Sequence, residues 1–313
     1  MANKVTNTRN IIDSDANVKI RTSKLRRNPL WAEILIYSII FLLATATILP
    51  MLNVLAQSLS PSHVISRVPF MIFPQETTLE AYSYIFKTPA LLHSFGVSVG
   101  VTGIGTILSL VVTMFAAYGL SKTKVPGNKI LMKIIVLAML FHAGIIPTYI
   151  VINKGLHLID KYPVLVLPYL ANSYNIILMR NFFWSIPAEL EESAYIDGAS
   201  DMMTLWHLIL PLSKPAIATI GLFYAVGHWN DFYRGLIYLN DSTMWPLPMM
   251  LRSIVVDNRM VGMGSLPETL QRVVDPENIK AATIIFATVP ILLVYPFIQK
   301  HFTQGIMVGA IKG

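Results

Sequence analysis

Long runs of apolar residues limit what this 313-residue chain can fold into. A helix that crosses the hydrocarbon core of a bilayer needs about 20 mostly apolar residues, because its backbone groups must bond within their own segment. Five runs qualify by length and by their near absence of charge: residues 31–54, 94–120, 134–152, 162–179 and 281–298. Only 13% of all residues are charged, against about a quarter in soluble domains, so buried helices of a soluble core are a poor alternative. We therefore predict a polytopic membrane protein.

A sixth and weaker candidate span lies before Asn230. The apolar stretch from Pro215 to Asn230 is short for a span and ends in a polar run, but apolar residues on either side can lengthen it. The predicted fold class is all-α integral membrane, with six transmembrane helices. Their expected bounds, within a transmembrane domain at 31–301, are residues 31–54, 94–120, 134–152, 162–179, 213–232 and 280–299.

The basic residues predict how the spans are oriented. Seven Lys and Arg residues precede residue 31 and four more lie in the short connection 121–133, and compact basic segments of this kind stay in the cytoplasm. Topology thus explains the net charge of +7, and we expect no nucleic-acid partner. A basic N-terminal segment (1–30) and a C-terminal tail (302–313) are expected in the cytoplasm, and a long loop (234–279) outside it.

Small residues mark one face of the second predicted span. Gly96, Gly100 and Gly103 lie along this face. Small residues let helix backbones approach closely where lipid supplies no hydrophobic driving force. The pattern predicts tight helix packing and says little about function.

The connection between the fourth and fifth predicted spans, residues 186–211, predicts two helices with a turn between them. Pro187, followed by three glutamates, favours a helix start, because acidic side chains stabilise the positive end of the helix dipole. Gly198 can adopt the left-handed conformation that ends a helix. A second helix then runs from Ser200 to Pro211. Lipid does not require such a surface helix, so we interpret it as a docking element for a cytoplasmic partner.

The residues of this connection resemble the EAA motif of type I ABC importer permeases. In that family E-A-A is followed by three residues, G, nine residues and I-x-L-P. The spacing here is the same, although serine replaces the middle residue of the triplet and leucine replaces the isoleucine. The matching residues are Glu192, Ser193, Ala194, Asp197, Gly198, Leu208, Leu210 and Pro211. The resemblance covers residues 95–313 and implies that these residues form a coupling helix, which sits in a cleft on a separate ATP-hydrolysing subunit.

Two further segments resemble the carbohydrate branch of that family, which includes the maltose-type permeases. One is the run from Trp229 to Tyr233, and the other is the C-terminal tail with Gly305, Gly309 and Lys312. The resemblance implies that the tail reaches into the interface of the ATPase pair. Its glycines predict a segment too flexible to pack as a helix, and a frayed terminus is the alternative.

The chain has no phosphate-binding loop of the G-x-x-x-x-G-K-[ST] type and no catalytic or metal-ligand constellation. We therefore predict a non-catalytic subunit with no cofactor or metal of its own, driven by Mg-ATP on a partner. The resemblance implies three kinds of protein partner in a prokaryotic cytoplasmic membrane: a second homologous permease subunit, a dimer of ATP-binding subunits and an extracytoplasmic solute-binding protein.

Candidate substrate contacts combine aromatic rings with amide or carboxylate groups, a mixture that suits sugars. They are Asn172, Tyr174 and Asn175 in the fourth predicted span, and Trp229, Asn230 and Asp231 at the end of the fifth. The alternative is that these residues cap helices or belong to an interfacial aromatic belt. The long external segment favours docking of the binding protein and an oligosaccharide substrate.

Other functions stay open at this point. A secondary transporter or channel would want intramembrane charges or an inverted repeat, and neither is visible in the sequence. A membrane enzyme would need a polar catalytic constellation at interface depth. Within the ABC class, peptides, phosphate or amino acids are alternative substrates.

Overall fold

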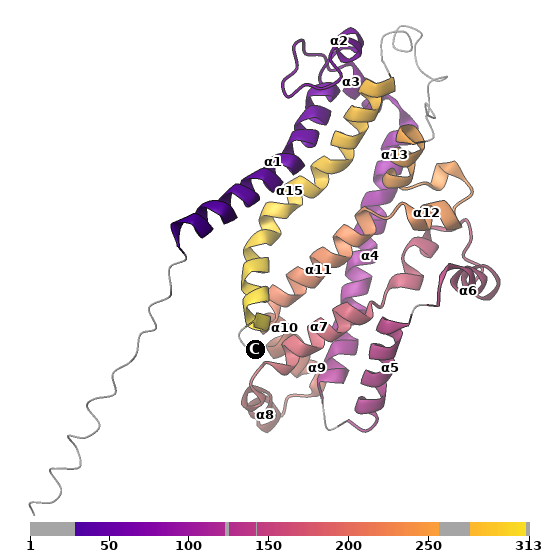
Figure 1. Ribbon diagram of the computed structural model, residues 1–313. Coiled ribbons are helices and arrows are strands. Elements are labelled where there is room, and N and C mark those ends of the chain that lie inside the picture. The colour runs from indigo at the N-terminus through magenta and orange to yellow at the C-terminus, as the bar shows by residue number, and fades with distance from the viewer. Residues whose placement is uncertain (1–28, 123–124, 142, 257–275, 311–313) are drawn as a thin grey trace, which may run out of the picture. The chain divides into compact units, whose positions relative to one another are not determined.

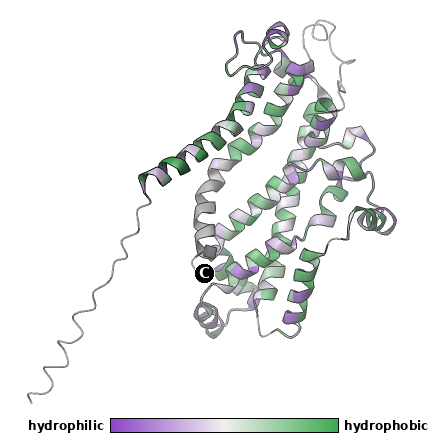
Figure 2. Ribbon diagram, viewed as in Figure 1, coloured by the Kyte–Doolittle hydropathy of each residue, from purple (hydrophilic) through white to green (hydrophobic). Residues whose placement is uncertain are grey.

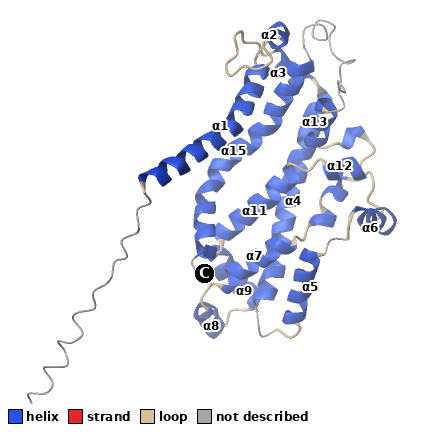
Figure 3. Ribbon diagram, viewed as in Figure 1, coloured by secondary structure: helices blue, strands red, loops and turns tan. Residues whose placement is uncertain are grey.

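The computed structural model describes residues 29–122, 125–141, 143–256 and 276–310. Within these ranges the secondary structure is helical, with loops and turns between the helices (Figure 3). The chain divides into two units, residues 1–51 and residues 52–313. The first unit holds the N-terminal part of α1 (Leu30–Ser58), which is strongly apolar (Figure 2).

The second unit contains the end of α1 and all later helices (Figure 1). The earlier ones are α2 (Ser62–Arg67), α3 (Glu80–Lys87), α4 (Pro89–Ser121), α5 (Asn128–Leu140), α6 (Ile145–Ile150) and the π-helix η2 (Val151–Gly155). The later ones are the 3-10 turns η3 (Tyr162–Leu165) and η4 (Leu167–Tyr169), α7 (Ser173–Trp184), α8 (Ala188–Ile196), α9 (Asp201–Thr204), the π-helix η5 (Leu205–Ile209), α10 (Leu210–Leu212), α11 (Lys214–Trp229), α12 (Tyr233–Tyr238), the 3-10 turn η6 (Ser242–Met244), α13 (Leu247–Val255) and α15 (Pro276–Ala310).

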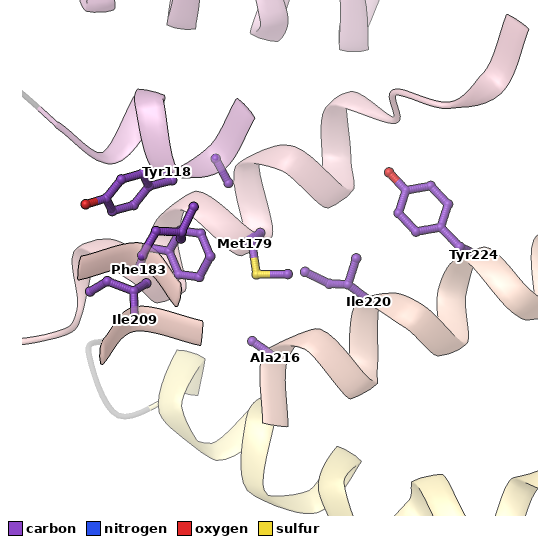
Figure 4. Packing of buried hydrophobic residues seen from close by; sticks show 9 residues of the cluster. Tyr118, Met179, Phe183, Ile209, Ala216, Ile220 and Tyr224 are labelled. Carbon is purple, nitrogen blue, oxygen red and sulfur yellow. The ribbon is translucent and has the colours of Figure 1, made fainter. Parts of the chain in front are cut away.

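A buried apolar cluster joins α4, α7, η5 and α11 (Figure 4). Met179 and Phe183 of α7 lie at its centre, between Ile209 of η5 and Ile220 of α11. Burying each such side chain stabilises the bundle by about 1.5–3 kcal/mol. The cluster fixes the segment after α8 against the long helix α4.

Three described helical segments are long and apolar enough to cross a membrane: Leu30–Ser58, Pro89–Ser121 and Pro276–Val294. Two bent pairs are further candidates, namely Asn128–Leu140 with Ile145–Gly155 and Asp201–Leu212 with Lys214–Trp229. The pairs are bent by 111° and 83°. The predicted all-helical membrane class is confirmed, and the described residues supply three to five candidate spans rather than six.

The predicted helix at 162–179 is wrong. This segment holds η3 and η4, and α7 begins only at Ser173 and runs to Trp184. Pro163 and Pro168 explain the difference, because proline lacks an N–H and clashes with the preceding helical turn. A continuous helix across both prolines is therefore unfavourable.

The segment 234–279, predicted as an external loop, contains helices in the residues that the structure describes. Two helices, α12 and α13, occupy its first part, and residues 257–275 lie outside the described residues. Met250 and Ile254 of α13 are buried with Ile279 of α15 in a second apolar cluster. This part of the segment is therefore part of the bundle's core.

The expectation of a non-helical tail is also wrong for residues 302–310. One helix, α15, continues to Ala310, whereas Lys312 lies outside the described residues. Extending an existing helix avoids the unfavourable nucleation step. This advantage outweighs the penalty of about 1 kcal/mol for each of Gly305 and Gly309.

The three glycines of the small-residue stripe in α4 make no close contact among the described residues. A Cβ atom built on Gly96, Gly100 or Gly103 would meet no heavy atom of the described residues within 4 Å. Close approach occurs instead at Gly105, where a Cβ would lie 2.8 Å from Nε2 of His228 in α11. The tight contact between α4 and α11 therefore depends on a glycine outside the stripe.

Candidate coupling site

The segment after α7 folds into two short helices, as the sequence predicts. The first of them, α8, begins after Pro187 and has Glu189 and Glu191 in its first turn. The second consists of α9, η5 and α10 in succession. Ser200 caps its start, because its hydroxyl oxygen accepts a hydrogen bond from the Met203 N–H over 3.3 Å.

Gly198 makes the turn between these helices. Its φ angle of +83° lies in the left-handed region. The Gly198 N–H donates to the Tyr195 carbonyl over 3.0 Å, and the Ala199 N–H donates to the Ala194 carbonyl over 2.9 Å. These two bonds form a Schellman motif, which satisfies carbonyl groups at the end of α8. The helix therefore stops where the sequence predicts.

Most of the motif residues face outward. Those exposed are Glu192, Ser193, Asp197, Gly198 and Pro211, whereas Ala194, Leu208 and Leu210 are half-buried. No residue of α8 is buried, so hydrophobic packing does not fix this helix. Ile196 at its end is 87% exposed. The outer face of α8 thus presents acidic side chains beside an exposed apolar one.

A cluster of charged and phenolic side chains ties α8 to the end of α4. Lys122 forms an ion pair with Glu191, and its ammonium also donates to Oη of Tyr195 over 3.1 Å. Tyr195 in turn donates to Oδ1 of Asp201 over 2.5 Å. The Lys122 ammonium lies 4.5 Å from the ring centroid of Tyr118, within cation–π distance. We call Tyr118, Lys122, Glu191, Tyr195 and Asp201 the Lys122 cluster.

The protonation states in the Lys122 cluster follow from its contacts. Burial lowers the pKa of Lys122, but hydrogen bonds to Glu191 and Tyr195 outweigh burial, and the pKa is raised above its ordinary value. Burial, together with the hydrogen bond to Asp201, raises the pKa of Tyr195 to about 12. Lys122 therefore stays charged and the phenol stays protonated at physiological pH.

Other helices bond to the same end of α4. Nδ2 of Asn128, at the start of α5, donates to the carbonyls of Lys122 over 2.7 Å and of Leu120 over 3.1 Å. Nε of Arg180, in α7, donates to the Leu120 carbonyl over 3.3 Å. The carbonyl end of a helix carries partial negative charge, which these donors stabilise. Neither these contacts nor the Lys122 cluster can be predicted from the sequence pattern.

The first group of predicted substrate contacts lies around the start of α7. Oδ1 of Asn172 accepts the Asn175 N–H over 3.0 Å, so Asn172 caps this helix. The Asn172 N–H donates to Oη of Tyr224 over 3.3 Å. Asn175 is buried, and Tyr174 is 53% exposed. Asn172 thus has the capping role that was the alternative interpretation.

The second group lies at the end of α11. Trp229 is 8% exposed, and its Nε1–H donates to the Ala287 carbonyl of α15 over 3.1 Å. Asp231 forms an ion pair with Arg234 and accepts the Arg234 backbone N–H over 3.1 Å. Asn230 is exposed at the C-cap of α11. Trp229 and Asp231 therefore already have partners within the chain.

A cavity of about 530 Å³ opens at this end of α11, between α13 and α15. Its lining includes Trp229, Asn230, Phe232, Arg252 and Thr288, with no acidic residue in the part of the chain that the structure describes. Aromatic rings with a few polar groups are typical of small-molecule sites. Trp229 and Asn230 of the second predicted group line this cavity, whereas Asn172, Tyr174 and Asn175 of the first group do not.

Comparisons with known proteins show which proteins this chain resembles. Residues 61–308 match the family described as binding-protein-dependent transport system inner membrane component. The chain is 47% identical over 268 residues to protein LplC of Bacillus subtilis, which covers 85% of this chain and 90% of LplC. It is 43% identical over 288 residues to the polygalacturonan/rhamnogalacturonan transport system permease protein YtcP of the same species, covering 90% and 98%.

A solved structure is similar over most of the chain. It is a bacterial ABC transporter involved in the import of the acidic polysaccharide alginate, with a TM-score of 0.81 and 30% identity, covering 86% of this chain and 96% of that one. These likenesses confirm the family that the EAA motif indicated. Permease subunits of this family are non-catalytic, and their transport depends on a binding protein. This chain therefore belongs to the binding-protein-dependent inner membrane components and is a multi-pass permease subunit of a bacterial ABC importer.

Proposed function

We propose that this chain forms half of the translocation pathway of an ATP-driven oligosaccharide importer and receives the work of ATP hydrolysis through α8. The observation that carries the proposal is a helix that buries none of its residues and yet is held to α4 by the Lys122 cluster. Glu192 and Ser193 of this helix and Asp197 at its C-cap are exposed. A helix that is held in place on one side and exposed to solvent on the other is suited to docking into a partner protein.

In this proposal α8 sits in a cleft on a separate ATP-binding subunit, which holds Mg-ATP. Glu192 offers a charge-assisted hydrogen bond to that subunit, and Gly198 sets the angle between α8 and α9. Closure of a pair of ATP-binding subunits pushes two such helices together, one from this chain and one from a second homologous permease. The transmembrane helices then turn as rigid bodies. The C-terminal tail, with Gly305, Gly309 and Lys312, makes a second contact with the ATPase pair.

The proposal includes six spans, with both ends of the chain and α8 on the cytoplasmic side. The segment made of η3, η4 and α7 supplies a crossing in addition to the five candidates. Irregular backbone at membrane depth is tolerated where protein covers it, and Val164 and Leu165 of η3 are buried. Lys122, in the basic connection 121–133, forms an ion pair with Glu191 of α8, which supports a cytoplasmic location for both.

The substrate in this proposal is an oligosaccharide that carries carboxylate groups. YtcP is described as a permease for polygalacturonan and rhamnogalacturonan, and the similar solved transporter imports an acidic polysaccharide. The cavity at the end of α11 offers the rings of Trp229 and Phe232 to sugar faces and the Arg252 guanidinium to a carboxylate. Of the sequence-predicted contacts, Trp229 and Asn230 line this cavity.

Uptake by the reconstituted complex tests the proposed function. The chain, its partner permease, the ATP-binding subunits and the binding protein are placed in proteoliposomes with labelled oligosaccharides. We expect uptake with ATP and none with a non-hydrolysable analogue. Uptake by the purified chain alone, without nucleotide, would mean a secondary transporter and would overturn the proposal.

A further inference from the structure

Among the described residues, the Lys122 cluster supplies the polar side-chain contacts between α8 and the end of α4. Because α8 buries no side chain, its position depends on polar contacts and on the turns at its ends. Lys122 bonds to two residues of this helix, Glu191 and Tyr195, which lie one helical turn apart. Two attachment points on one helix fix its rotation as well as its distance from α4.

The same cluster reaches across the glycine turn to the second helix. Tyr195 donates to the Asp201 carboxylate, and the Tyr118 hydroxyl donates to the Asp201 carbonyl over 3.2 Å. Lys122, Tyr195 and Asp201 thus form a continuous chain of hydrogen bonds between α4, α8 and α9. The side chains of Lys122 and Glu191 are 21% and 22% exposed, so water screens their attraction less than at an open surface.

The other end of α4 is bonded to the region of the α11 cavity. The Ser98 hydroxyl oxygen accepts the Leu247 N–H of α13 over 2.7 Å, and both residues are buried. Leu251 and Arg252 of α13 line the cavity. In Figure 1, α8 and α9 lie at one end of α4, and α13 lies at the other. The 33 residues of α4 measure about 50 Å, enough to cross a bilayer core of about 30 Å.

From this arrangement we infer that Lys122 is a positioning residue, which locks α8 to α4 so that a push on the coupling helix moves α4 and α13 as one body. The inference rests on the proposed function, because it assigns the rigid link through which that push travels. Without Lys122, α8 can swing on the Gly198 turn while the bundle stays still. ATP hydrolysis then continues without an equal movement at the substrate cavity.

Uptake per ATP hydrolysed is the quantity that tests the inference. In the full reconstituted transporter, Lys122→Met removes the charge and keeps the length of the side chain. We expect uptake per ATP to fall on the order of tenfold, within the usual range of coupling between sites. Equal amounts of the ATP-binding subunit should still co-purify, because the exposed docking face is unchanged. Lys122→Arg should restore much of the lost uptake per ATP.

Lys129→Met is the matched control. Lys129 lies near Lys122 in sequence and is exposed, and the substitution changes the net charge by the same amount. We expect wild-type uptake per ATP for this variant. Should Lys122→Met fold poorly, Tyr195→Phe removes only the hydroxyl that joins Lys122 to Asp201, and uptake per ATP should fall in this variant too.

A distance measurement separates a loosened link from a merely destabilised protein. The chain has no native cysteine, so spin labels can be placed on cysteines introduced at Ile196 and Val125, which are both exposed. We expect a narrow distance distribution in the wild type and a broad one in Lys122→Met. Unchanged distances and unchanged uptake per ATP in Lys122→Met would overturn the inference about Lys122 but not the proposed function. A wild-type complex without ATP-dependent uptake would overturn the proposed function instead.

Discussion

The backbone conformation at residue 198, rather than the space around it, determines which amino acids fit there. The φ angle is +83°, and a Cβ atom there would meet no described heavy atom within 4 Å. Gly198→Ala should therefore destabilise the turn by about 1–2 kcal/mol through backbone strain alone. Gly198→Asn should cost less, because asparagine tolerates this conformation. Uptake by the reconstituted transporter compares the two variants. If Gly198→Asn were as impaired as Gly198→Ala, backbone strain would not be the cause.

Asp160 gives the molecule an acid-sensitive contact outside the predicted spans. Its carboxylate accepts hydrogen bonds from the Asn240 side chain over 2.9 Å, from the Asn240 N–H over 2.5 Å and from the Asp241 N–H over 3.4 Å. These bonds, that of the Asn240 side chain first, hold the pKa of Asp160 below its ordinary value. Because the pKa of Asp160 is lower in the folded than in the unfolded chain, these bonds stabilise the fold fully above the ordinary aspartate pKa of about 3.9. The stabilisation is lost as pH falls through the lower pKa of the folded state.

Thermal unfolding in detergent from about pH 6 to pH 3 checks this prediction. We expect the wild type to lose stability more steeply at the acidic end than Asp160→Asn, which cannot titrate at this position. Asparagine also suits the positive φ of 54° at this residue. Parallel curves for the two proteins would show that the contact does not respond to protonation.

At the scale of the helix, Gly105 and Gly103 form a natural pair for comparison. Both lie in α4, but only a Cβ on Gly105 would collide with His228, at 2.8 Å from Nε2. We expect Gly105→Ala to lower stability by about 1–3 kcal/mol, because the buried ring of His228 has to shift. Gly103→Ala should leave stability unchanged or raise it by up to about 1 kcal/mol through helix propensity. Unfolding in detergent ranks the two, and the opposite order would be inconsistent with close packing at Gly105.

The helices predicted well from the sequence are those whose signal is local. The uncharged run at 94–120 predicted α4, and Pro187 and Gly198 predicted the start and end of α8. At 162–179 the apolar character predicted one helix, but Pro163 and Pro168 favour 3-10 turns there. Apolar runs predict a lipid environment but do not predict whether the helix is continuous.

The Lys122 cluster could not be predicted in the same way. Lys122 and Glu191 are 69 residues apart, and Tyr118 and Asp201 are 83 residues apart. Such pairs meet only because α4 and α7 run beside each other and bring the start of α8 back to the end of α4 (Figure 1). Residue type did not single out Lys122 either, because membrane topology already accounts for the positive charge of the connection 121–133.

For the whole transporter, Arg252 is the residue whose charge we expect to set substrate preference. Arg252 lines the α11 cavity together with the rings of Trp229 and Phe232. A hydrogen bond to a charged group contributes about 1.5–3 kcal/mol, so Arg252→Gln should reduce uptake of an acidic oligosaccharide on the order of tenfold or more. Uptake of a neutral oligosaccharide of equal length should change little.

Competition between the two labelled sugars in proteoliposomes measures this selectivity. Arg252→Lys keeps the charge but loses the two-pronged geometry of arginine, so we expect an intermediate preference. An equal loss of uptake for acidic and neutral sugars would mean that Arg252 stabilises the fold and does not select the substrate.

The length of α15 has a mechanical consequence. Its 35 residues span about 52 Å, so about 20 Å extend beyond a hydrocarbon core of about 30 Å. Near its start, Ile279 and Ala282 are buried in the apolar cluster with α3 and α13. Trp229 of α11 also donates to Ala287, so α15 is held to the bundle along its first third, and a small tilt of that part becomes a larger displacement toward Ala310. A fluorophore attached near Ala310 would therefore report each transport cycle in real time.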